Sequence, residues 1–147
     1  MLYNIRNINN KQMIIVNNFK QTQNSILSFY NRNKKMFETK ACIGENGTTI
    51  NKIESDGKTP EGIFELGVFF GMYCKEDIKI NRNIEYKQID KNLYWVDDIY
   101  SKHYNQLVDI RSVRKDWRSA EHLMAYPREY EYAIEIKTNP ENIKGKR

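Results

Sequence analysis

The side chains best suited to catalysis or ligand binding lie between Tyr100 and Leu123. This stretch contains both histidines of the chain, His103 and His122, and the aromatic residue Trp117. It also holds four basic residues: Arg111, Arg114, Lys115 and Arg118. A basic strip with interleaved aromatic residues could bind single-stranded nucleic acid by stacking, or it could line a cleft for an anionic or peptide substrate. A lone histidine is more often structural, so a structural role is favoured for both.

The cysteines and histidines give little support for nucleophilic or metal chemistry. Cys42 and Cys74 have neither CxxC spacing nor a neighbouring histidine, whereas a catalytic thiol needs a base and oxyanion donors nearby. The two could form one disulfide, but two free thiols are favoured. Cys42 lies in an apolar alternation, which predicts a packed position on a strand. With two histidines and no His–Cys cluster, no metal or other cofactor is expected.

Two further polar features give weak signals. Asp97 and Asp98 could supply half of an acid pair, but adjacent carboxylates on a strand point to opposite faces. A solvated loop end is therefore the favoured interpretation. The glycines at Gly44–Gly47 and Gly67–Gly71 lack the spacing of a phosphate-binding loop.

The elements that must position these residues are predicted to be mostly β-strands. Alternating or β-branched runs predict strands at Gln12–Val16, Ser25–Tyr30, Met36–Ile43, Ile63–Leu66, Leu93–Val96 and Tyr130–Lys137. Turns are predicted at Asn31–Lys34 and Asn46–Gly47, since asparagine and glycine tolerate left-handed backbone. The sequence therefore indicates a mainly β fold.

One short helix is predicted near the second histidine. Ser119 can cap its N-terminus, and Ala120, Leu123 and Met124 fall at helical spacing. Pro127 is expected to end it.

Length and charge bound the class of protein. With 147 residues and a net charge of +5, the chain is expected to form a single domain, 1–147. Residues 1–60 hold nine basic and four acidic residues, and the remainder is neutral overall. This balance favours a solvated, slightly basic surface, although an anionic partner such as nucleic acid, anionic lipid or an acidic wall polymer also fits. No apolar run is long enough to predict a signal peptide or a transmembrane segment.

A resemblance to a known family emerges at Asp56–Phe64, which contains the order Thr-Pro-x-Gly-x-Phe. This stretch is similar to the signature of the bacterial L,D-transpeptidase catalytic-domain family. Further stretches between Met13 and the end resemble one branch of that family in the same order: Ala41–Gly47, Phe70–Gly71, Tyr94–Asp98, Tyr104–Asn105, Trp117, Ser119–Leu123 and Tyr130–Ile136. The ordered set is considerably more specific than the signature by itself.

The resemblance implies a β-sandwich-like fold with one short helix and a reaction on peptidoglycan stem peptides. In the family, a Cys activated by a His attacks the carbonyl after a diamino acid and forms a thioester. An amine of a neighbouring stem then takes the acyl group, while backbone N–H groups hold the oxyanion. The family also implies a location in the cell wall or outside the cytoplasm.

The sequence departs from the family pattern at the catalytic residues. The family His lies on a downstream strand, followed by a Ser/Thr-x-Gly-Cys motif, and neither Cys42 nor Cys74 matches that context. No catalytic residue is therefore assigned, and the chain is expected to be C-terminally incomplete, to lack the last strands and to be inactive alone. By resemblance, His122, Asn105 and Tyr104 are the candidate substrate-binding residues.

Two other functions stay open at this point. The chain could be a non-catalytic module that binds peptidoglycan, or an unrelated basic β domain that binds nucleic acid. The resemblance favours stem peptides as the partner and leaves nucleic acid unexpected. The sequence does not indicate an oligomeric state.

Overall fold

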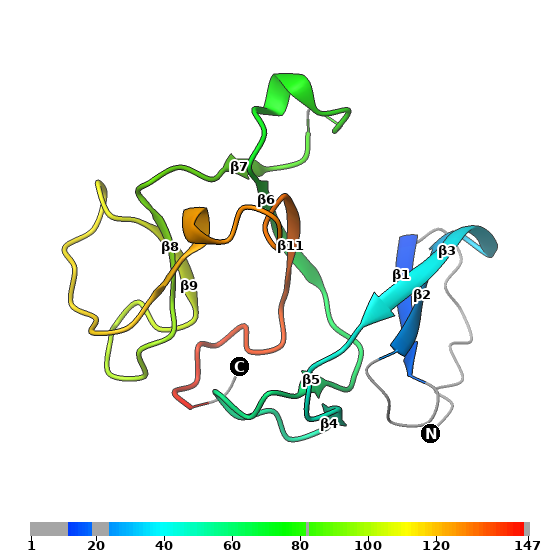
Figure 1. The fold of residues 1–147 in the computed structure, drawn as a ribbon, viewed down its shortest axis with the longest axis horizontal. Helices are drawn as coiled ribbons and strands as arrows, with labels where there is room; N and C mark the ends of the chain where they lie inside the picture. The colour runs from blue at the N-terminus through cyan, green and yellow to red at the C-terminus, as the bar shows by residue number, and fades with distance from the viewer. Residues whose placement is uncertain (1–11, 19–23, 82, 146–147) are drawn as a thin grey trace. The chain divides into compact units, whose positions relative to one another are not determined.

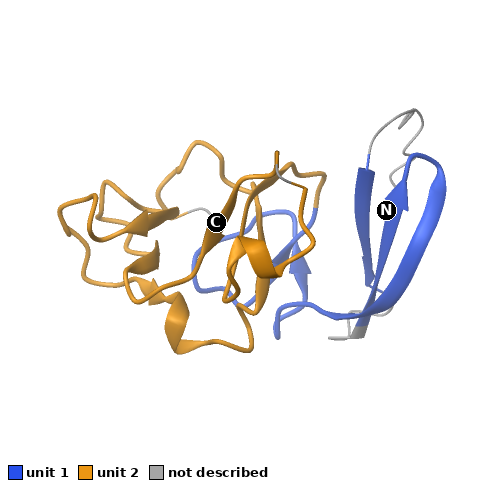
Figure 2. Cartoon of the chain, turned by 90° about the horizontal axis from the view of Figure 1, so that it is seen from above, with its two compact units in different colours: residues 1–61 blue, residues 62–147 orange. Residues whose placement is uncertain are grey.

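The computed structural model describes residues 12–18, 24–81 and 83–145 (Figure 1). These residues form strands and two short 3-10 turns, so the expectation of a mainly β fold is confirmed. In chain order the elements are β1 Gln12–Asn18, β2 Asn24–Asn31, β3 Lys34–Cys42, β4 Thr48–Thr49, β5 Thr59–Pro60, β6 Leu66–Gly71, η1 Lys75–Asp77, β7 Tyr86–Gln88, β8 Leu93–Val96, β9 Gln106–Asp109, β10 Glu121–His122, η2 Leu123–Ala125 and β11 Tyr132–Ile136. The chain divides into two compact units, residues 1–61 and 62–147 (Figure 2).

Unit 1 contains an antiparallel sheet of three strands in the order β1-β2-β3. The register aligns Ile14, Phe29 and Phe37 across the sheet, and the Phe29 and Phe37 rings lie 5.5 Å apart. The strands expected in this part of the chain are confirmed, as is the turn between β2 and β3. Arg32 rather than an asparagine takes the left-handed backbone there, with φ 55°.

The packed position predicted for Cys42 is wrong. The residue is on a strand, but its side chain is exposed. The reason is that β3 is an edge strand of the three-stranded sheet, and nearly all its residues face solvent.

The second part of unit 1 holds the Thr-Pro step in a parallel pair of short strands. Thr48 and Thr49 of β4 align with Thr59 and Pro60 of β5. The Thr59 hydroxyl accepts a 2.8 Å hydrogen bond from the Gly44 backbone N–H. A Cβ at Gly44 would overlap the carbonyl oxygen of Gly57, so this close approach requires glycine.

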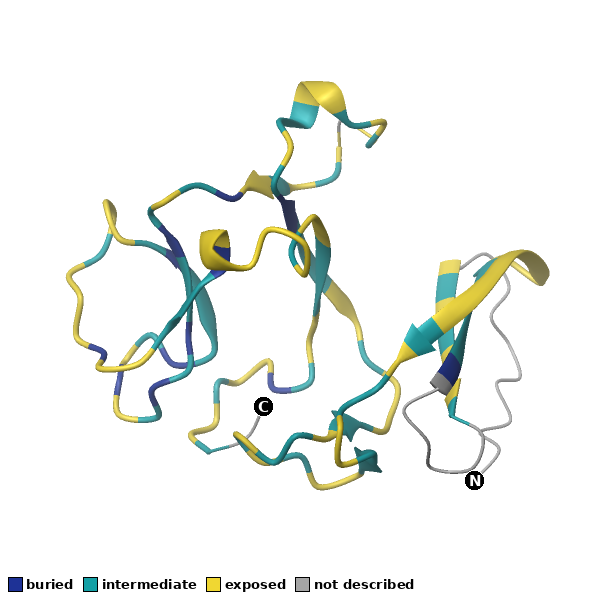
Figure 3. Cartoon of the chain, in the orientation of Figure 1, coloured by how far each residue is buried: buried dark blue, intermediate teal, exposed yellow. Residues whose placement is uncertain are grey.

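Unit 2 contains two further three-stranded sheets, in the orders β11-β6-β7 and β10-β8-β9. Its core contains two clusters of buried apolar residues, and Figure 3 marks the buried positions along the chain in dark blue. The first cluster consists of Phe70, Ile89, Leu93 and Leu123. The second consists of Val96, Val108 and Trp117. Leu93 and Val96 are three residues apart on β8, so their side chains point to opposite faces of the strand. Leu93 therefore packs in the first cluster and Val96 in the second.

Two expectations for unit 2 are wrong in detail. The stretch expected as a helix from Ser119 to Pro127 forms β10 and the 3-10 turn η2 instead. Eight residues are too few for a self-supporting helix, and pairing of Glu121 with Trp95 on β8 displaces it. The strand expected at Ile63–Leu66 is shifted, because pairing of β6 with β11 begins at Leu66.

Candidate functional site

Two of the three candidate residues, Tyr104 and Asn105, are neighbours in the turn between β8 and β9. The Tyr104 side chain is only 2% exposed. Asn105 adopts left-handed backbone with φ 60°, and its N–H donates a 2.7 Å hydrogen bond to the Val96 carbonyl. The turn therefore buries the tyrosine and leaves Asn105 half-buried.

The Asn105 side chain is bound to the C-terminal part of unit 2. Its Nδ2 donates to the Asn139 carbonyl at 3.0 Å and to Asn142 Oδ1 at 3.1 Å. Asn139 is itself 5% exposed, and its Oδ1 accepts a hydrogen bond from the Ile143 N–H. These contacts assign Asn105 a role in joining two loops.

The third candidate, His122, lies on β10 and faces β8. Its ring stacks on Tyr94, with 4.5 Å between ring centroids and 13° between planes. Its Nε2 donates a 3.2 Å hydrogen bond to the Lys91 carbonyl, which can only accept. The register pairs His122 with Tyr94. Tyr94 lies two residues before Val96 on β8, and Val96 pairs with Gln106, the residue that follows Asn105.

The carboxylate expected at a solvated loop end is buried instead. Asp98 is 9% exposed and accepts hydrogen bonds from the N–H groups of Tyr100, at 2.9 Å, and Arg118, at 2.7 Å. The bond from Arg118 contributes most to lowering the pKa of Asp98 below its ordinary value. The sequence drew attention to Asp98 but did not indicate its role, which is to join the turn at Tyr100 to the segment that contains Arg118.

The basic, aromatic strip does not expose its tryptophan. Trp117 is 5% exposed, and its ring and that of His103 form a T-shaped pair, with 5.8 Å between centroids and 89° between planes. His103 is half-buried, and its Nε2 is buried with no hydrogen-bond partner among the described residues. Its backbone N–H donates to Ser101 Oγ, which in turn donates to Asp116 at 2.6 Å.

The structure contains one feature that the sequence did not reveal, a cleft of about 610 Å³ in unit 2. Residues of two outer strands line the cleft. The strand β7 is the outer strand of the sheet β11-β6-β7, and β9 is the outer strand of the sheet β10-β8-β9. Buried apolar groups, Leu93 and Val108, contribute to its lining. The complete lining is Lys87, Gln88, Asp90, Leu93, His103, Gln106, Leu107, Val108, Asp109, Arg111, Ser112 and Val113.

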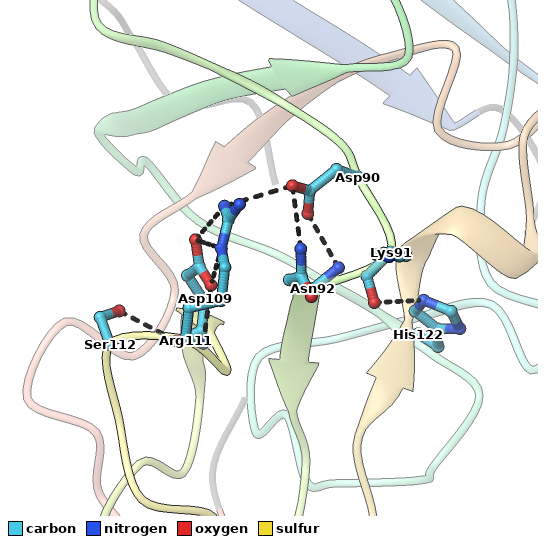
Figure 4. Close-up of polar contacts among 7 residues, drawn as sticks. All are labelled: Asp90, Lys91, Asn92, Asp109, Arg111, Ser112 and His122. Atoms are coloured by element: carbon cyan, nitrogen blue, oxygen red, sulfur yellow. Dashed lines mark hydrogen bonds and ion pairs between the residues drawn. The ribbon is translucent and has the colours of Figure 1, made fainter.

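A network of opposite charges lies in this cleft. Figure 4 shows the guanidinium of Arg111 between the carboxylates of Asp109 and Asp90. Arg111 Nε donates to Asp109 at 2.9 and 3.1 Å, and its Nη2 reaches Asp109 at 2.5 Å and Asp90 at 3.2 Å. The hydrogen bonds from Arg111 lower the pKa of Asp109 to about 2, so this carboxylate is ionised at neutral pH. Asn92 holds the second carboxylate by donating to Asp90 through its backbone and side chain.

The described residues include no group of three or more His, Cys, Asp and Glu side chains arranged to hold a metal ion. Cys42 and Cys74 both have free thiols in this structure. Within the described part of the chain, no helix has the length and apolar character needed to cross a bilayer.

Comparison of the chain with models of protein families, with curated proteins and with solved structures found no match.

Proposed function

We propose that this chain belongs to an L,D-transpeptidase-type domain and that its cleft holds peptidoglycan stem peptides. The observation that carries this proposal is a cleft between two outer strands in a chain that has the Thr-Pro-x-Gly-x-Phe order. An outer strand has unpaired N–H and C=O groups, which can bind an extended peptide as an additional strand. A β-sandwich arrangement of the sheets is part of the same proposal.

The residues that carry the family resemblance also have defined structural roles, which supports the proposal. Thr59 accepts the Gly44 N–H bond, and Pro60 takes part in the parallel pair of β4 and β5. In unit 2, a Cβ at Gly62 would lie 2.7 Å from the ring of Phe64. Thr59, Pro60, Gly62 and Phe64 of the signature therefore each have a defined local contact.

The proposal assigns binding rather than catalysis to this chain. Among the described residues neither thiol is hydrogen-bonded to a histidine, since the His103 ring meets Trp117 and the His122 ring meets Tyr94 and Lys91. A thiol without a base is a poor nucleophile at neutral pH. We therefore expect no thioester at Cys42 or Cys74.

The alternative of nucleic-acid binding is disfavoured by one observation. The buried Trp117 offers no ring face on which a base could stack. A non-catalytic module that binds peptidoglycan would use the same cleft. It would differ from the proposed L,D-transpeptidase-type domain only in ancestry.

Titration of the isotope-labelled chain with a soluble stem tetrapeptide tests the proposal. Amide signals of β7 and β9 should shift in a saturable way, and a peptide of the same length, charge and terminal groups with a scrambled sequence should bind more weakly. Intact-mass measurement after incubation with a carbapenem should show no adduct. Absence of stem-peptide binding would refute the proposal, and an adduct would refute the non-catalytic assignment.

A further inference from the structure

The two carboxylates that line the cleft are already hydrogen-bonded within the protein, whereas one edge of the Arg111 guanidinium is not. Asp109 is held by the Arg111 side chain and backbone N–H, and Asp90 is held by Asn92 and Arg111. Both carboxylates are therefore largely occupied. The Nη1 group of Arg111 makes no hydrogen bond to any described residue, although a guanidinium has five N–H donors.

A second cation on the opposite border of the cleft adds to these donors. Lys87 lies on β7, and its only ion pair among the described residues is a long one, 3.8 Å, to Glu85. Its side chain is 44% exposed. Lys87 lines the same cleft as Arg111, Asp109 and Asp90, and its positive charge contributes to lowering the pKa of Asp109.

The wall of the cleft also offers an apolar surface. Leu93 and Val108 contribute to the lining, and both are largely buried. His103 lines the cleft as well, but its Nε2 is buried and therefore not accessible to a ligand.

We propose that Lys87 and the free edge of Arg111 hold the C-terminal carboxylate of an extended peptide that lies along β9. A carboxylate is the acceptor that matches a guanidinium and an ammonium best. Asp109 and Asp90 position the guanidinium, and the apolar wall accommodates a small side chain beside the carboxylate. This inference rests on the proposed function for the identity of the peptide, and it adds which end of that peptide is recognised.

A comparison of two peptides that differ only at the C-terminus tests the carboxylate anchor. The stem tetrapeptide is titrated as its free acid and as its C-terminal amide against the full chain by calorimetry. We expect the amide to bind about tenfold more weakly or worse, the factor for one lost charge-assisted hydrogen bond. Equal affinities would overturn the inference while leaving the proposed function intact.

Variants then assign the anchor to named residues. Lys87→Gln should weaken binding of the free acid about tenfold and leave binding of the amide unchanged. Arg128→Gln removes an equal charge from an exposed position outside the cleft and should change neither. Arg111→Gln should act like Lys87→Gln, with Trp fluorescence verifying the fold.

The remaining outcomes separate the two proposals. If Lys87→Gln weakens the free acid and the amide equally, the lysine does not contact the carboxylate and the inference fails. If neither form of the stem peptide binds, both proposals fail. If a scrambled free-acid peptide binds as tightly as the stem peptide, the cleft is a carboxylate site but the assignment to stem peptides is wrong.

Discussion

Asn105 and Asn142 are joined by a 3.1 Å hydrogen bond between their side chains, and both adopt left-handed backbone, with φ 60° and 52°. Asparagine tolerates this conformation better than other residues with a Cβ. The pair connects the β8–β9 turn to the C-terminal segment of unit 2. The contact depends on both the left-handed backbone and the amide side chain of Asn105. Two substitutions of Asn105 can therefore separate the contributions of backbone and side chain to stability.

The variants Asn105→Gly and Asn105→Ala both lose the side-chain bonds, but only alanine strains the backbone. We expect alanine to be less stable than glycine by about 1 kcal/mol in urea unfolding. In both variants the Ile143 amide, which donates to Asn139 Oδ1, should exchange its hydrogen faster than in wild type. Equal stability of the two variants would contradict a strained backbone at this position.

Leu123 is 1% exposed and belongs to the first apolar cluster of unit 2. Leu123→Ala should lower the free energy of unfolding by about 2–5 kcal/mol, because it removes buried methyl groups and leaves a cavity. Met124→Ala, at the next and 44% exposed position, is the matched control and should change it by less than about 1 kcal/mol. Fluorescence of Trp95 and Trp117, both in unit 2, monitors the transition.

The stability of unit 2 should fall as the pH drops below about 4, the ordinary pKa of aspartate. The pKa values of Asp98, Asp109 and Asp116 are lowered in the folded chain, to about 2 for Asp109. A lowered pKa stabilises the folded state above the unfolded pKa, and this contribution is lost as pH falls through the folded pKa. The urea midpoint should therefore decrease between about pH 4 and about pH 2.

A pair of variants tests the carboxylate origin of this effect. Asp109→Asn should show a smaller acid-induced decrease in urea midpoint than wild type. Asp77→Asn, in the exposed turn η1, is the control and should follow wild type. An identical decrease in Asp109→Asn and wild type would mean that the Arg111 pair contributes nothing to acid stability.

The two thiols should differ in reactivity toward a disulfide reagent. Cys42 is exposed on the edge strand β3, and Cys74 is partly buried before η1. Modification of the native chain should therefore show a fast phase that Cys42→Ser removes. If Cys42→Ser removed the slow phase instead, the assignment of the fast phase to Cys42 would be contradicted.

Local patterning was sufficient to predict some elements and insufficient for others. The continuous apolar run Leu93–Val96 predicted β8 with its observed bounds, because a strand that packs against a cluster on each face has apolar residues at every position. Between Ser119 and Pro127 the helical spacing was misleading, since pairing with β8 and stacking of His122 on Tyr94 stabilise an extended backbone. A short segment takes the conformation that its tertiary partners impose.

The cleft could not be predicted, because it depends on two outer strands that belong to different sheets. The strand β7 lies in a weakly patterned stretch, and β9 has only four residues. The short spacing from Asp109 to Arg111 was visible as sequence, but nothing local indicated that Asp90 would complete the network. Lys87 is distant in sequence from Asp109 and Arg111 and lines the same cleft only in the folded chain.

The pairing of β6 with β11 has a consequence for biosynthesis. Gly71 aligns with Tyr132, so β6 meets this partner only after about sixty more residues have left the ribosome. At translation rates of about 5–20 residues per second, that delay is roughly 3–12 s. During this interval Phe70 lacks part of its native cover, whereas the β1-β2-β3 meander of unit 1 can already form from neighbouring segments. The nascent chain therefore passes through a stage at which it is a natural client for chaperones that bind exposed apolar segments.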